Sequence, residues 1–126
     1  MAILERDDSG AIARLTMNSP GNLNALSDAM LAALSAEFER LAEDPTIRVV
    51  TLTGTGKAFC AGHDLKEMQA SRQSPDKGRA YFADLFSRCT AVMTAIRDLP
   101  QPVIAAPHGI ATAAGCQLVA SCDMAV

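Results

Sequence analysis

Two β-rich runs in this chain each end in a turn of small residues, and a helical pattern follows each turn. The run "IRVVTLTG" (residues 47–54) leads into "GKAFCAGHDLKEM" (residues 56–68), and "VIAAP" (residues 103–107) leads into "HGIATAAG" (residues 108–115). Both runs are nearly continuous in apolar or β-branched residues, as is typical of strands buried on both faces of a parallel sheet. The repeated order of strand, turn and helix therefore predicts an α/β fold with a mostly parallel sheet.

The rest of the chain supplies the other elements of such a fold. Residues 2–7 and 11–17 predict a hairpin joined by "DDSG", and "CDMAV" at the end predicts a further strand. Ser27 is a suitable N-cap for a helix of about 16 residues. Apolar stripes at helical spacing mark this helix and a second one: Met30, Leu34, Phe38 and Leu41, then Phe82, Leu85, Cys89, Val92 and Ile96. With 126 residues the chain is long enough for one domain, residues 1–126. The last strand has no closing helix, so we expect the domain to be incomplete at its C-terminus.

Composition and charge argue against several classes of protein. The formal net charge is -3 and the eleven basic residues are scattered, so we expect no nucleic-acid partner. No apolar run approaches the ~20 residues that span a bilayer, so we expect no membrane association. The first ten residues carry acids and do not resemble a targeting signal. Four cysteines without a Cys-x-x-Cys pair indicate free thiols, and together these features predict a cytoplasmic protein.

The turn "GKAFCAGHDLKEM" is open to several readings when its side chains are considered. Cys60 and His63, with His108 from the other turn, match no common zinc spacing, so we expect no metal. A nucleophilic Cys60 is an alternative that would need His63 or His108 as its base. The segment "GTGKAF" lacks the pattern of a nucleotide-binding phosphate loop.

The main chain of the two turns offers a different chemistry. Small residues let a ligand approach the backbone, and the first N–H groups of a helix have no partner within that helix. Two such N–H groups that converge on one carbonyl oxygen would form an oxyanion hole, which stabilises a transition state by about 3–4 kcal/mol. Spacing alone favours the simpler interpretation, two tight turns that bind no ligand.

Three segments resemble, in order, the signature segments of the enoyl-CoA hydratase/isomerase (crotonase) family. They are "NLNALSDAM" (residues 22–30), "GKAFCAGHDLKEM" and "PQPVIAAPHGIATAAGCQLVASCDMAV" (residues 100–126), and the resemblance begins near Ile12. It implies a crotonase-like (ClpP/crotonase) fold, in which β-β-α units form a superhelix around parallel sheets, with residues 1–126 as its N-terminal acyl-CoA-binding core. It further implies a lyase or isomerase of fatty acid metabolism that assembles as a trimer or hexamer.

The resemblance also implies which residues form the site. The backbone N–H groups of His63 and Ala114 would bind the thioester oxygen and stabilise an enolate-like intermediate. A coenzyme A thioester would be the substrate, with no separate cofactor and no metal. The positions that the resemblance assigns to substrate and CoA binding are Asn24, Ala25, Leu26, Ala61, Gly62, Asp64, Leu65, Lys66 and Gly115.

The sequence departs from the family pattern at a residue that matters for hydration. Hydratases of the family carry a catalytic glutamate where this chain has Gln117, and glutamine has no titratable proton. The position of the family's second carboxylate would lie beyond Val126. An enoyl-CoA hydratase or isomerase is therefore the leading prediction. A CoA-ester-binding protein without turnover and an acyl-CoA hydrolase stay open as alternatives.

Overall fold

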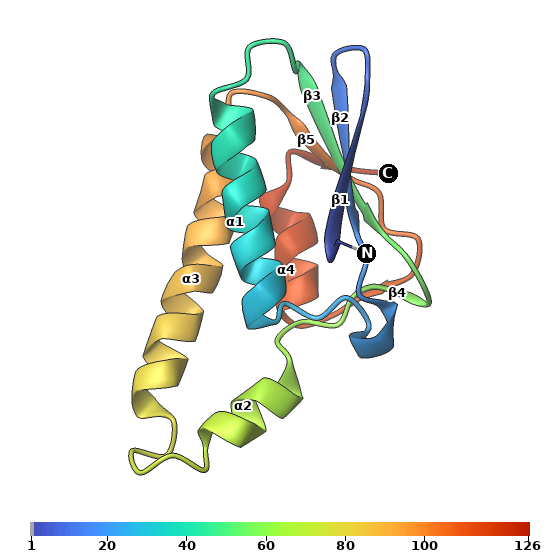
Figure 1. Cartoon of the computed structure of the whole chain (residues 1–126). Coiled ribbons are helices and arrows are strands. Elements are labelled where there is room, and N and C mark those ends of the chain that lie inside the picture. Colours follow the sequence, from blue (N-terminus) through green and yellow to red (C-terminus); the bar gives the residue numbers. More distant parts are fainter. Residues whose placement is uncertain (1) are drawn as a thin grey trace.

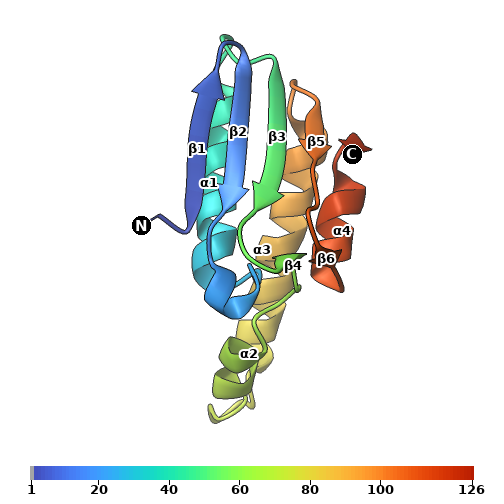
Figure 2. The ribbon, with the colours of Figure 1, turned by 90° about the vertical axis from the view of Figure 1, so that its right-hand side faces the viewer.

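The computed structural model describes residues 2–126, which form a five-stranded sheet with helices packed against one of its faces (Figures 1 and 2). The strand order is β1-β2-β3-β5-β7, and all neighbouring pairs are parallel except β1 and β2. The predicted α/β arrangement with a mostly parallel sheet is confirmed. The elements in chain order are β1 (Leu4–Ser9), β2 (Ile12–Met17), α1 (Asp28–Ala42), β3 (Val49–Gly54), β4 (Ala58–Cys60), α2 (Leu65–Ser71), α3 (Arg79–Asp98), β5 (Val103–Ala105), β6 (Ile110–Ala111), α4 (Ala114–Ser121) and β7 (Met124–Ala125).

The chain opens with the predicted hairpin, but its turn lies two residues later than expected. The pairing of β1 with β2 continues to Ser9 opposite Ile12, so Asp7 and Asp8 belong to the strand. Gly10 occupies the turn with φ +60, a left-handed conformation that glycine adopts without steric cost. The polar letters "DDSG" suggested an early turn, whereas the pairing with β2 extends the strand through them.

Helices α1 and α3 follow their predicted apolar stripes. The Ser27 side chain accepts a hydrogen bond from the N–H of Met30 at 3.1 Å, which caps the start of α1 as expected. The two helices and α4 lie on the same side of the sheet in both views (Figures 1 and 2). Their buried apolar side chains meet those of β2, β3 and β5 in one core cluster. No helix within residues 2–126 has both the length and the apolar character needed to cross a membrane.

The expectation that the strands are buried on both faces is wrong for the described chain. In β3, Val50 and Leu52 are fully buried, whereas Val49, Thr51 and Thr53 on the opposite face are only partly buried. The reason is that α1, α3 and α4 all lie on the same face of the sheet, whereas α2 lies beyond its end (Figures 1 and 2). The threonines within "VVTLTG" are consistent with this one-sided burial.

A second, two-stranded sheet was missed by the sequence reasoning, and it shapes the site. Strands β4 and β6 are three and two residues long and pair in parallel. They lie below the carboxyl ends of β3 and β5, close to the start of α4 (Figure 2). Such short strands leave no readable alternation of side chains. Their pairing joins the two small-residue turns at the edge of the main sheet where ligands of α/β proteins commonly bind.

We predict that stability falls in acid because of the buried carboxylate of Glu37. Burial alone would raise its pKa, but hydrogen bonds from the guanidinium groups of Arg40 and Arg6 outweigh that effect and hold the pKa below 4.5. A carboxylate with a lowered folded-state pKa contributes stability that is fully present above pH 4.5 and is lost as the pH falls through the folded-state pKa. Urea unfolding at pH 7, 5 and 3.5 should therefore show a declining free energy of unfolding.

The variant Glu37→Gln should lose about 1–2 kcal/mol at pH 7, because it removes the charged partner of Arg40 and one of the three carboxylates that bind Arg6. It should also lose less further stability than the parent between pH 5 and 3.5. Glu39→Gln is the matched control, since Glu39 is exposed on the same helix and forms no ion pair within residues 2–126. An acid response that is the same in the parent and in Glu37→Gln would contradict the assignment.

Candidate functional site

The two small-residue turns predicted from the sequence lie in direct contact. Gly62 has φ +93, and a Cβ atom placed there would lie 3.2 Å from the main-chain nitrogen of Ala114 and 3.0 Å from the Cβ of Ala113. The N–H of Thr112 also donates to the carbonyl oxygen of Cys60 at 3.1 Å. Strand β4 and the start of α4 therefore meet at Gly62 and Ala114.

A second glycine permits this close approach. A Cβ atom on Gly115 would lie 2.1 Å from the carbonyl oxygen of Cys60, a distance that no folded chain tolerates. The first turn of α4 thus packs directly on the backbone of β4, and only glycine fits between them. The predicted role of Gly115 in substrate binding stays a prediction, but its packing role is evident from this contact.

Two backbone N–H groups where these turns meet are without a hydrogen-bond acceptor within residues 2–126. Within residues 2–126, neither the N–H of His63 nor that of Ala114 donates a hydrogen bond. The backbone on either side of His63 is bound to the neighbouring loop: Ala61 donates to Leu23 at 3.1 Å, and Leu26 donates to Gly62 at 2.7 Å. The turn is therefore held in place while the His63 N–H is left available, and Ala114 is the first residue of α4, whose N–H has no helical partner.

Ala113 adopts a strained conformation immediately before this donor. Its φ of 53 and ψ of -126 lie in a region that non-glycine residues rarely occupy. Such backbone strain costs on the order of 1–3 kcal/mol and is concentrated at functional sites. The conformation turns the chain sharply from β6 into α4 and leaves Ala114 at the helix start.

A pocket of about 480 Å³, hereafter the His63 pocket, opens beside the two turns. Five of the residues predicted to bind substrate or CoA line it, namely Ala25, Ala61, Asp64, Leu65 and Lys66, together with the predicted backbone donor His63. It is also lined by five residues that the sequence reasoning missed: Gly21, Asn22, Leu23, Met68 and Ala113. The position of Ala113 beside the predicted donor Ala114 was a signal for one of them. The other four residues line the pocket only because the fold brings their segments together, and no sequence motif marks them.

Two of the predicted binding residues have side chains that are buried within the protein. The side chain of Asn24 is fully buried and donates to the carbonyl oxygens of Thr55 and Ala58 at 2.8 and 3.0 Å. Leu26 is fully buried and pairs with His63 as an isolated parallel bridge. These side chains therefore shape the loop, and their contact with a ligand stays a prediction that burial does not support.

Asp64 also has a local role that the sequence reasoning did not assign. Its carboxylate accepts hydrogen bonds from the N–H groups of Lys66 and Glu67 at 2.9 and 3.2 Å, and so caps α2. The other carboxylate oxygen accepts from the side-chain amide of Asn22 at 3.2 Å. The pattern Asp-x-x-Glu before a helix was a readable signal for this cap.

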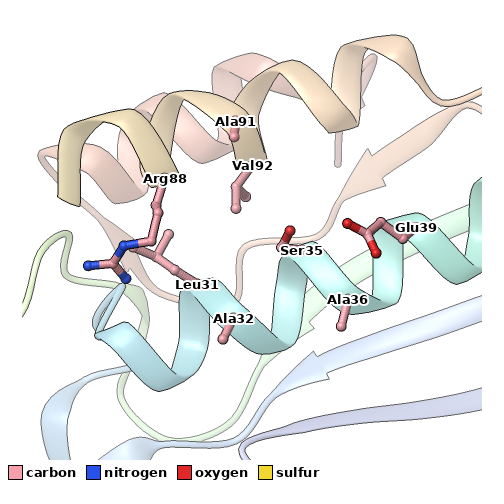
Figure 3. A pocket seen from close by; sticks show the side chains of 8 residues that line it. All are labelled: Leu31, Ala32, Ser35, Ala36, Glu39, Arg88, Ala91 and Val92. Atoms are coloured by element: carbon pink, nitrogen blue, oxygen red, sulfur yellow. The ribbon is translucent and has the colours of Figure 1, made fainter. Parts of the chain in front are cut away.

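Gln117 lies apart from the His63 pocket in the described chain. Its side chain is exposed and lines a separate hollow of about 470 Å³ between α3 and α4, together with Met93, Arg97 and Asp123 among others. The expectation that Gln117 stands at a catalytic position therefore stays a prediction. A further hollow, of about 270 Å³, lies between α1 and α3 with Arg88 and Glu39 at its two ends (Figure 3), and it contains none of the predicted site residues.

The side chains that suggested thiol or metal chemistry are not assembled for it. Burial raises the pKa of the Cys60 thiol, which disfavours the thiolate that a nucleophile requires. The Nε2 atom of His108 is instead 2.9 Å from the carbonyl oxygen of Gly56, on another part of the loop. No group of three or more His, Cys, Asp or Glu residues within residues 2–126 is placed to hold a metal ion.

The chain is similar to known proteins in both sequence and fold. The enoyl-CoA hydratase/isomerase family model matches residues 7–126. Enoyl-CoA hydratase domain-containing protein 3 of Xenopus laevis is 44% identical over 115 residues, which cover 91% of this chain and 37% of that protein. The 1,2-epoxyphenylacetyl-CoA isomerase of Escherichia coli K12 is 33% identical over 124 residues, covering 98% of this chain and 46% of that enzyme. The crystal structure of an enoyl-CoA hydratase from Mycobacterium smegmatis superposes with a TM-score of 0.90 at 59% identity, covering 98% of this chain and 46% of the other.

Two conclusions and one correction follow from these comparisons. The predicted crotonase-like fold is confirmed, and the chain spans about two-fifths to one half of the length of the proteins it matches. The prediction of a cytoplasmic location is wrong: the similar Xenopus laevis protein is named as mitochondrial. The lack of a signal within the first ten residues was not a sufficient reason to infer a compartment. The chain belongs to the enoyl-CoA hydratase/isomerase family.

Proposed function

We propose that the whole protein is an acyl-CoA enzyme, an enoyl-CoA hydratase or isomerase, that holds the thioester oxygen between the N–H groups of His63 and Ala114. The observation that supports it most is that two N–H groups without a hydrogen-bond partner within residues 2–126 belong to turns that touch at Gly62. Two preorganised donors stabilise the negative charge that develops on a thioester oxygen when a proton leaves the α-carbon, or when water adds to the β-carbon of a 2-enoyl thioester and gives up a proton. The resulting enolate is common to hydration and to movement of the double bond.

The surroundings of these donors suit a CoA thioester. The His63 pocket is lined largely by small or apolar residues near the turns, including Ala25, Ala61 and Ala113. Lys66 is exposed on the rim and offers a cation to the phosphates of CoA. Small residues at the turns let the thioester approach the main chain, and a nearby apolar wall strengthens the hydrogen bonds that it forms there.

The experiment that tests the proposal compares ligands with and without the thioester oxygen. Calorimetric titration of the whole protein with butyryl-CoA, with the matched S-butyl-CoA thioether and with free butyrate separates the contributions. We expect butyryl-CoA to bind about tenfold more tightly than the thioether, because only the thioester has an oxygen for the two donors. Butyrate should bind far more weakly than both. Equal affinity of the thioester and the thioether would contradict the oxyanion site.

Gln117 favours a second candidate function, CoA-ester binding without turnover or with hydrolysis of the thioester. The amide of glutamine orients a water molecule but cannot take its proton. Assays with crotonyl-CoA, a 3-enoyl-CoA and a saturated acyl-CoA distinguish hydration, double-bond movement and hydrolysis. Tight binding without turnover of any of the three would favour the second candidate. We also propose that the whole protein forms a homo-oligomer, a trimer or hexamer, which sedimentation analysis would test.

A further inference from the structure

The imidazole of His63 is not explained by the role of its main chain. The ring packs edge-on against Phe86 of α3, with 5.6 Å between ring centroids and an interplanar angle of 63°. Its Nδ1 atom is buried and has no hydrogen-bond partner within residues 2–126. Its Nε2 atom also forms no hydrogen bond there, but it is not among the buried atoms. The ring therefore presents a single accessible nitrogen, from a side chain that lines the His63 pocket.

The two nitrogens differ in which of them can carry the proton. A proton on Nδ1 would bury a donor without an acceptor, which costs roughly 1–3 kcal/mol, and a second proton would add a buried charge. The neutral ring with its proton on Nε2 buries no N–H and no charge; only the lone pair of Nδ1 is then left without a partner, and the donor lies on the accessible nitrogen. Burial also lowers the pKa of His63, in agreement with a neutral ring. In this form the accessible nitrogen donates a hydrogen bond and has no lone pair with which to act as a base.

Most of the other polar side chains that line the pocket already form hydrogen bonds within residues 2–126. The carboxylate of Asp64 caps α2, and the amide of Asn22 donates to Asp64 while its oxygen accepts from Ser19. Lys66 has no ion pair or side-chain hydrogen bond within residues 2–126, and it is exposed on the rim. His63 is thus the one uncommitted polar side chain among the described residues that stands between the pocket and the apolar ring of Phe86.

We propose that the His63 side chain determines specificity, by donating a hydrogen bond from Nε2 to an oxygen on the acyl group of the substrate. The inference rests on the proposed function, because the main chain of His63 would hold the thioester oxygen at the same time. An acyl group that carries a hydroxyl close to the thioester would satisfy this donor. A hydrocarbon acyl group would leave the donor unpaired once the ligand excludes water. The substrate class is therefore an oxygen-bearing acyl-CoA.

Matched ligands test this inference on the whole protein. Calorimetry with butyryl-CoA and with its 2-, 3- and 4-hydroxy derivatives gives the ratio of their affinities. We expect at least one hydroxy derivative to bind about tenfold more tightly than butyryl-CoA, as one well-placed hydrogen bond allows. The variant His63→Phe keeps an aromatic ring against Phe86 but removes the donor, and it should bring this ratio to about one. In the control Lys66→Met the ratio should stay near its parent value.

Each outcome has a distinct meaning. A ratio near one in the parent protein, a ratio unchanged in His63→Phe, or a ratio lost in Lys66→Met would overturn the inference while leaving the proposed function intact. Failure of every acyl-CoA to bind would overturn the proposed function itself. ¹⁵N-edited NMR of the histidine rings provides a readout that does not depend on folding of a variant: we expect the proton of His63 on Nε2, and a proton on Nδ1 would contradict the donor role.

Discussion

Replacing Gly115 by alanine is expected to destabilise the protein by about 3 kcal/mol and to abolish its activity with it. The added Cβ would lie 2.1 Å from the carbonyl oxygen of Cys60 and 2.8 Å from its carbonyl carbon, and both are backbone atoms of β4 that no side-chain rotation can move. Overpacking of this kind typically costs 1–3 kcal/mol, and a clash with backbone belongs at the upper end. Because Gly115 holds α4 against β4, the shift would separate the turns that carry His63 and Ala114. Urea unfolding of the variant and the parent measures the effect.

Gly21→Ala is the matched control for this substitution. A Cβ at Gly21 meets no atom within 4 Å, and its φ is not in the left-handed region. The same chemical change there should alter the free energy of unfolding by no more than about 0.5 kcal/mol. Equal stabilities of Gly115→Ala and Gly21→Ala would show that α4 does not pack on β4 as described.

Replacing Ala114 by proline is expected to lower kcat by about 10²- to 10³-fold. Proline removes the N–H, which donates no hydrogen bond within residues 2–126, puts a ring carbon in its place and restricts the conformation of Ala113 before it. Ala114 is the first residue of α4, the helix position that accepts proline best. Loss of one donor from an oxyanion hole has an effect of this size on the transition state. The assay is turnover of whichever enoyl-CoA the parent protein converts, at saturating substrate.

Ala114→Gly is the control, because it keeps the N–H while it changes the side chain, and its kcat should stay within a few-fold of the parent value. Thermal unfolding of both variants establishes that they are folded. The preference for butyryl-CoA over its thioether gives a second measure, which should fall in Ala114→Pro and persist in Ala114→Gly. Full activity together with an unchanged preference in the proline variant would exclude the Ala114 N–H from the site.

Elements with a long repeating pattern were predictable from the sequence. Helices α1 and α3 each show several apolar residues at spacings of three and four, and Ser27 marks the start of α1 through its cap. Each pattern is internally redundant, so a single exception, such as the exposed Phe86, does not hide it. The short strands β4 and β6 have no such redundancy, and only their mutual pairing defines them.

The candidate site was predictable only where a local motif specified it. The turns before α2 and α4 could be read as places where backbone N–H groups are left free, and the family resemblance assigned these to His63 and Ala114. The side chains of Asn24 and Asp64 were assigned to ligand binding on the same resemblance, whereas the structure commits them to the loop and to the α2 cap. The same residue type can bind a ligand or stabilise a loop, and only its hydrogen-bond partners in the folded chain distinguish these two roles.

By itself the sequence determined the class of the fold, the family and the two turns, because these depend on spacing within one segment or on motifs in order. Tertiary structure alone decided that the turns touch at Gly62, that Gly115 must lack a side chain, and that His63 has one buried and one accessible ring nitrogen. The first two of those facts depend on distances between segments about 50 residues apart. Such distances are set by the packing of α4 on β4, for which no single segment carries a signal.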